Sequence, residues 1–131
     1  MIVIVTVGNE LIEEDSLGVI VGKKIESKIG ERDGVKFIHS FTVPENVTGI
    51  IRQLNPKLVV FIDSAIFGGE PLAWRIFRRN EIKTGFSSTH SLSLSLVSEF
   101  IENSIGCETR IVGIQIPLEP GDYRSNMEKT V

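Results

Sequence analysis

The sequence contains little cysteine and little histidine: one cysteine, Cys107, and two histidines, His39 and His90, among 131 residues. A lone cysteine can form neither an internal disulfide nor a cysteine metal cluster. Any metal ion must therefore be bound by carboxylates and the two histidines. The longest apolar runs, near residues 1–5 and 58–62, are far shorter than the roughly 20 residues of a membrane-spanning helix. We therefore expect no membrane partner.

An excess of basic residues is also absent, because 14 Lys and Arg face 17 Asp and Glu for a net charge of −3. This balance gives no support for a nucleic-acid partner. The N-terminus lacks the basic start and cleavage site of a signal peptide, so we expect a cytoplasmic protein. The turn at Gly8 and Asn9 lacks the further glycines of a dinucleotide-binding loop. Length and composition predict one globular domain over residues 1–131.

Strand-like and helix-like segments alternate along the chain. Apolar and β-branched runs predict strands at residues 2–7, 35–39, 58–62, 72–77 and 110–116. Amphipathic spacing predicts helices at residues 15–29, 44–54 and 91–103, and residues 126–131 resemble the start of another. The arginines around the fourth strand favour an edge position, with Trp74 as a packing residue of that edge. The order predicts an α/β fold, a three-layer α-β-α sandwich around a mostly parallel five-stranded sheet.

Three polar side chains stand where chemistry is expected in such a fold. Ligands of open α/β sheets bind beyond the carboxyl ends of the strands. Asp15 follows the first strand, Asp63 comes directly after the third, and His90 lies on the loop entering the third helix. Two carboxylates and a neutral imidazole suit zinc, nickel or cadmium, and an incomplete set leaves positions for water or substrate. The residues alone thus indicate a rim that can bind a metal ion.

Simpler interpretations exist for most of these side chains. Asp15 can cap the helix that follows it, with the acids at positions 13 and 14 as solvated charges. His90 can be a hydrogen-bonding residue at a helix start, and His39, which ends a strand, is expected to be structural or exposed. Asp63 is the hardest to explain in this way, because a carboxylate that leaves a buried strand still needs polar partners.

Four motifs occur in an order that resembles one family. They are Val7-Gly8-Asn9-Glu10-Leu11-Ile12-Glu13-Glu14-Asp15-Ser16-Leu17-Gly18, Leu58-Val59-Val60-Phe61-Ile62-Asp63-Ser64-Ala65, Ser88-Thr89-His90-Ser91-Leu92 and Val112-Gly113-Ile114-Gln115-Ile116-Pro117. Together they resemble the nickel–iron hydrogenase maturation endopeptidases. The segment Thr42-Val43-Pro44-Glu45-Asn46 is similar to the branch that matures the hydrogenase of formate hydrogenlyase, the hydrogenase 3 type.

The resemblance implies a function and a set of site residues. It implies an endopeptidase that removes the C-terminal extension of a nickel-loaded hydrogenase large-subunit precursor, which would be its protein partner. Nickel would come with the substrate and serve as the recognition element, and zinc or cadmium could occupy the same site in vitro. Carried over by motif, Asp15, Asp63 and His90 would be both the metal ligands and the catalytic residues. A monomer or weak oligomer is expected.

The sequence departs from the family pattern in three places. Ser16-Leu17 follows the paired acid Glu14-Asp15 where a glycine or alanine often stands, although the ligand position is kept. His39-Ser40-Phe41-Thr42 stands where relatives usually carry an aspartate and glycines before the threonine. The usual long C-terminal helix is missing or reduced to residues 127–131, so one face of the sheet is expected to be less covered. Two alternative functions stay open: a non-catalytic, metal-dependent chaperone for a hydrogenase precursor, and a small metal-dependent hydrolase with another substrate.

Overall fold

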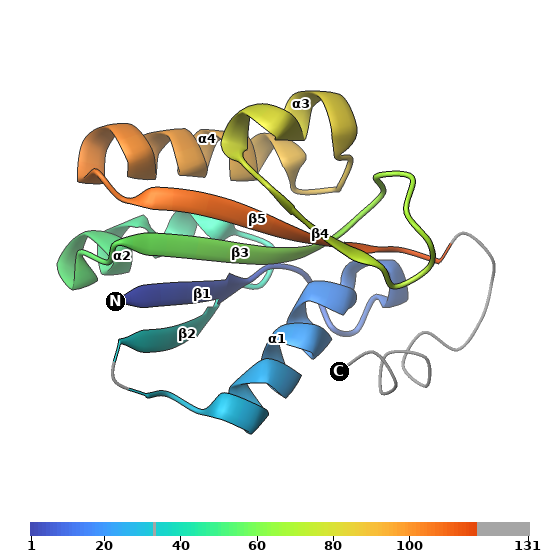
Figure 1. Ribbon diagram of the computed structural model, residues 1–131, viewed down its shortest axis with the longest axis horizontal. Helices are drawn as coiled ribbons and strands as arrows, with labels where there is room; N and C mark the ends of the chain where they lie inside the picture. Colours follow the sequence, from blue (N-terminus) through green and yellow to red (C-terminus); the bar gives the residue numbers. More distant parts are fainter. Residues whose placement is uncertain (33, 118–131) are drawn as a thin grey trace.

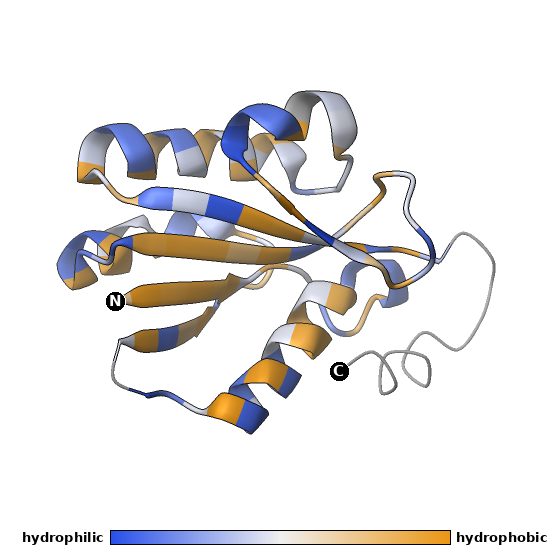
Figure 2. Cartoon of the chain, viewed as in Figure 1, coloured by the Kyte–Doolittle hydropathy of each residue, from blue (hydrophilic) through white to orange (hydrophobic). Residues whose placement is uncertain are grey.

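A central sheet of five strands organises the computed structural model, which describes residues 1–32 and 34–117 (Figure 1). The strands are β1 (Ile2–Thr6), β2 (Val35–His39), β3 (Leu58–Ala65), β4 (Trp74–Phe77) and β5 (Glu108–Gln115). Their order across the sheet is β2-β1-β3-β5-β4, and only β4 runs antiparallel to its neighbour. The central strands β1 and β3 are apolar along most of their length (Figure 2), as expected for strands covered on both faces.

Helices cover both faces of this sheet. They are α1 (Leu17–Ile29), α2 (Thr48–Leu54), α3 (Ile82–Gly85) and α4 (Ser91–Phe100), and a π-helical turn (Ile101–Ile105) continues α4. On one face, Leu17 and Val21 of α1 pack with Ile62 and Ile114. The larger core lies on the other face, where residues of α2, α3 and α4 pack against β1, β3 and β5. The predicted α/β sandwich with a mostly parallel five-stranded sheet is confirmed.

The structure corrects three details of the predicted elements. Strand β3 continues to Ala65, so Asp63 lies inside the strand and not after it. The short helix α3 was not predicted, because its four residues are too few to show an apolar periodicity. Trp74 does not pack as expected: it is 62% exposed on the edge strand. The helix start predicted at residues 126–131 lies outside the described residues.

The α1 face of the sheet carries an apolar hollow of about 470 Å³. Its lining includes Ile4, Val60, Val112 and Trp74, which come from four different strands or strand ends. Within residues 1–32 and 34–117, α1 is the α-helix that packs on this face. No helix in the described part of the chain is long and apolar enough to cross a membrane.

Helix α1 packs on the backbone of β3 without an intervening side chain. A Cβ atom at Gly18 would lie 2.4 Å from the carbonyl oxygen of Ile62 and 2.8 Å from the Cα atom of Asp63. Such separations lie far inside van der Waals contact, so a residue with a side chain cannot keep this position. The contact fixes the distance between the start of α1, which follows Asp15, and the middle of β3, which contains Asp63.

Candidate metal centre

The structure brings Asp15, Asp63 and His90 together. Asp63 points from β3 toward the α4 side of the sheet, because it alternates with Ser64 and shares a face with Phe61 and Ala65 of the larger core. Asp15 ends the 3₁₀ turn (Glu13–Asp15) before α1, and His90 immediately precedes α4. One ligand atom from each of the three side chains lies within 4.8 Å of the others.

Asp15 is bound by groups from two directions. Its Oδ1 atom lies 2.9 Å from Nε2 of His90, and its Oδ2 atom accepts a 3.0 Å hydrogen bond from the backbone N–H of Asn9. The first N–H group of α1, at Leu17, is instead bound by the hydroxyl of Ser64 at 3.1 Å. The interpretation of Asp15 as a helix cap is therefore wrong, because its carboxylate faces His90 and the preceding loop.

Gly8 allows the loop before Asp15 to close. Its φ angle is 130°, a conformation that strongly favours glycine. A Cβ atom at Gly8 would lie 2.1 Å from the carbonyl oxygen of Asp15. The same carbonyl accepts a hydrogen bond from the N–H of Asn9 at 3.1 Å. The Gly8-Asn9 pair therefore holds both the backbone and the carboxylate of Asp15 in place.

Asp63 is a fully buried carboxyl group with one unsatisfied oxygen. Its Oδ2 atom accepts a 2.8 Å hydrogen bond from the hydroxyl of Ser88. Its Oδ1 atom has no hydrogen-bond partner among the described residues. Burial raises the pKa of Asp63 to about 7, against the opposing effects of the Ser88 hydrogen bond and the charge of His90. An unpartnered buried oxygen costs free energy that a cation would recover.

Ser88 is a residue of this site that the sequence analysis missed. Besides donating to Asp63, its Oγ atom accepts a 3.0 Å hydrogen bond from the N–H of His90. Ser91 supports the same loop, since its Oγ atom accepts from the N–H of Ser88 at 2.8 Å. Only the proximity of Ser88 to His90 in the sequence could have indicated it, because a loop serine gives no pattern of its own.

The remaining candidates lie outside the centre. His39 contacts the Thr6 hydroxyl through Nδ1 at 2.6 Å and Glu26 through Nε2 at 3.0 Å, which agrees with the structural role expected for it. Both Glu13 and Glu14 are exposed, in agreement with their interpretation as solvated charges.

The donor set of the centre fits a divalent transition-metal ion. Two carboxylates and one imidazole are common zinc ligands, at about 2.0–2.2 Å from the metal, and nickel accepts the same atoms. His90 and Asp15 already share a hydrogen bond. A cation entering between them would take the place of the shared proton. Three ligands leave at least one coordination position free, so an ion here could also be bound by a second molecule.

The raised pKa of Asp63 predicts a stability change with pH in the metal-free protein. Below about pH 4 the carboxyl is protonated in both states, so its burial costs little. Between pH 4 and 7 only the unfolded chain ionises, and the free energy of unfolding falls by on the order of 4 kcal/mol. We expect Asp63→Asn, which lacks this titration, to gain stability relative to the wild type across this range. Urea unfolding with a chelator at pH 5 and pH 8 measures this.

The exposed residue Glu13 provides the control for this experiment. Glu13→Gln removes a solvated carboxylate and should follow the wild-type pH dependence. A stability difference between Asp63→Asn and the wild type that stays constant from pH 5 to pH 8 would contradict the expected titration of Asp63.

Comparison with known proteins decides the family. The family model described as HycI, hydrogenase maturation protease, matches residues 19–131. The chain belongs to the HycI family of hydrogenase maturation proteases. The matched range includes Asp63 and His90, whereas Asp15 precedes it. The resemblance found in the sequence motifs is thus confirmed at the level of the family.

Individual relatives of this family agree with the match. A protein of Methanocaldococcus jannaschii assigned as a hydrogenase maturation protease is 32% identical over 120 residues, which cover 87% of this chain and 71% of that protein. The hydrogenase 3 maturation protease of Escherichia coli K12 is 27% identical over 114 residues, covering 86% and 71%. The crystal structure of HycI from Thermococcus kodakarensis superposes with a TM-score of 0.77 at 28% identity, covering 98% of this chain and 85% of that one.

Proposed function

We propose that this chain is an endopeptidase that removes the C-terminal extension of a nickel-loaded [NiFe] hydrogenase large-subunit precursor. Asp15, Asp63 and His90 would bind the nickel that the precursor carries. The observation that supports this most directly is the unpartnered Oδ1 atom of Asp63, a buried residue whose carboxylate offers a ligand atom within 4.8 Å of ligand atoms from the other two residues. Membership of the HycI family supports a peptidase reaction as the activity and a hydrogenase precursor as the substrate.

The small number of ligands suits a metal ion that two proteins share. Three protein ligands do not saturate nickel or zinc, whereas ligands from the precursor would complete the coordination. The precursor would then bind strongly only when its nickel is present. Two ionised carboxylates balance the charge of a divalent cation, so the occupied centre is close to neutral. Processing would therefore depend on prior insertion of nickel.

A groove beside the centre supports the binding of a polypeptide. It has a volume of about 390 Å³, and its lining includes Gly8, Asn9, Leu11 and Phe41. Leu11 and Phe41 are 87% and 71% exposed, and Phe41 is held at a φ angle of 57°, where aromatic residues are rare. We propose that the part of the precursor adjacent to the scissile bond binds in this groove. The nickel would polarise the scissile carbonyl or activate the attacking water.

The mass of a purified precursor before and after incubation tests this function. We expect the nickel-loaded precursor to lose its extension and the nickel-free precursor to keep it, because only the loaded form completes the coordination of the centre. Cleavage of both forms at the same rate would contradict nickel recognition, although the protein would still be a protease. If cognate precursors bind without being cleaved, the protein is a chaperone and the proposed activity is wrong.

A further inference from the structure

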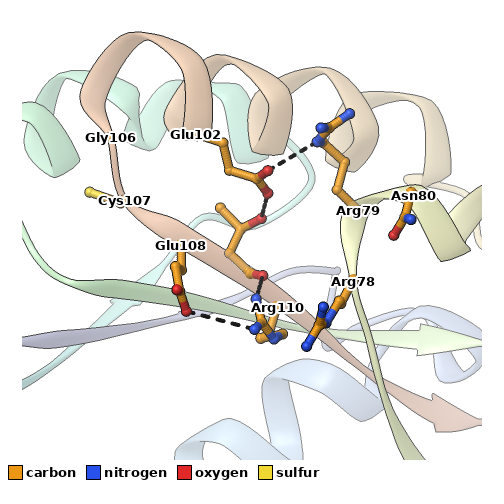
Figure 3. Close-up of a pocket in the computed structure, with 9 residues that line it drawn as sticks. Arg78, Arg79, Asn80, Glu102, Gly106, Cys107, Glu108 and Arg110 are labelled. Carbon is orange, nitrogen blue, oxygen red and sulfur yellow. Dashed lines mark hydrogen bonds and ion pairs between the residues drawn. The ribbon is translucent and has the colours of Figure 1, made fainter.

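A further cavity, of about 500 Å³, lies at the edge of the sheet where β5 begins and β4 ends (Figure 3). Three arginines line it, Arg78, Arg79 and Arg110. Asp63 pairs with Gly113 in β5, three residues after Arg110, which corresponds to about 10 Å along the strand. Asp63 also faces the side of the sheet opposite to Arg110, because Arg110 pairs with Val60 and an odd number of residues, three, separates Val60 from Asp63 along β3. The cavity is therefore separate from the candidate metal centre.

Two of these arginines flank the last residue pair of neighbouring strands. Phe77, the last residue of β4, pairs with Ile111 in β5, so Arg78 follows one member of this pair and Arg110 precedes the other. Figure 3 shows their guanidinium groups together in the cavity. Like charges that lie close together repel each other. The pair therefore costs stability in the protein alone.

The acidic residues of the cavity neutralise its three arginines only in part. Glu102 is already held by Arg79, at 3.3 Å from its Nε atom, and by the hydroxyl of Thr109. Glu108 is 74% exposed and lies 3.7 Å from Arg110. Within the described residues, Arg78 forms no ion pair. The cavity consequently keeps a positive charge on a protein whose net charge is −3.

We propose that this cavity binds the phosphate group of a small molecule. A phosphate presents its oxygens in a tetrahedral arrangement, so two guanidinium groups can bind it from different directions, whereas a carboxylate presents two oxygens in one plane. Arg78, directly after β4, and Arg110, in β5, would bind the phosphate together. Asn80, which also lines the cavity, offers a neutral amide for the remainder of the ligand. The volume falls within the range of small-molecule sites, about 300–1,000 Å³.

Titration calorimetry at low ionic strength tests the proposal with inorganic phosphate, pyrophosphate, ADP and citrate as probes. We expect the phosphate-bearing probes to bind and citrate to bind at least about tenfold more weakly. Arg78→Gln and Arg110→Gln should each weaken binding about tenfold or more, because each loses hydrogen bonds between charged groups. Tightest binding of ADP would identify a phosphate ester as the ligand class, and tightest binding of inorganic phosphate would identify the free ion.

Arg52→Gln is the matched control, because it removes the same charge from α2, where Arg52 lies 5.6 Å from the ring centroid of Phe100. It should bind every probe like the wild type. Without ligand, Arg78→Gln should unfold at the same temperature as the wild type or higher, since it relieves the repulsion from Arg110. Undetectable binding of all phosphate-bearing probes would overturn the proposal. Equal binding of citrate, or equal weakening by Arg52→Gln, would overturn it as well.

Discussion

Asp63→Asn is expected to lower the rate of precursor processing at least about 100-fold and to abolish tight binding of Ni²⁺ or Zn²⁺. Loss of a supporting residue around a metal typically costs 10- to 100-fold, and the loss of a charged ligand should cost more. Asparagine keeps the size of the side chain and can still accept the hydrogen bond from Ser88. The protein should therefore stay folded. Calorimetry with the metal ion alone and the mass of the precursor measure the two effects.

Glu14→Gln is a matched control for this variant and for Asp15→Asn. Glu14 is exposed and precedes Asp15 in the same 3₁₀ turn, so its substitution removes one charge beside the centre without removing a proposed ligand. Its processing rate should stay within about twofold of the wild type, as expected for a screened surface charge. Equal losses in Glu14→Gln and Asp15→Asn would show that general negative charge matters, and would contradict the assignment of Asp15 as a ligand.

Gly18→Ala is expected to destabilise the fold by about 1–3 kcal/mol and to lower processing as well. The added methyl group would meet the Ile62 carbonyl oxygen at 2.4 Å unless α1 moves away from β3. Such a movement would carry Asp15 away from Asp63, because Asp15 lies three residues before Gly18. Urea unfolding followed by circular dichroism measures the stability. The rate of precursor processing reports the displacement of Asp15 from Asp63.

Gly49→Ala shows what the same substitution does where there is space. Gly49 lies in α2, is exposed, and a Cβ atom there would have no neighbour within 4 Å. Because alanine favours helix more than glycine does, this variant should be as stable as the wild type or more stable by up to about 1 kcal/mol. If Gly18→Ala instead has the stability and the processing rate of the wild type, α1 is free to shift without disturbing the centre, and the prediction for Gly18→Ala is wrong.

The fold was predictable because the relevant signals are local. The apolar runs of β1 and β3 and the four-residue spacing of α1 are visible in any short window of the sequence. The end of β3 was not, because Ser64 and Ala65 extend the strand only through pairing with Ile114 and Gln115 of β5. Pairing between distant segments leaves no trace in the hydropathy of either one.

The convergence of Asp15, Asp63 and His90 was predictable from topology, since all three positions lie near one edge of a parallel sheet. Their supporting contacts were not. The hydrogen bond from Ser88 to Asp63 and the backbone contact at Gly18 depend on how α4 and α1 pack on the sheet. Trp74 shows the same limit, because an aromatic residue on an edge strand is buried only if another element covers it, and here it is 62% exposed.

The contact between Asp15 and His90 joins residues that are 75 positions apart in the sequence. Closing so long a loop is entropically unfavourable, so a partly folded chain gains little by forming this contact early. Whatever these side chains bind, they bind it only after the segments from β1 to α4 have assembled. A nascent or unfolding chain consequently has no such site. A ligand that binds there also stabilises the native state, by an amount set by its concentration relative to its Kd.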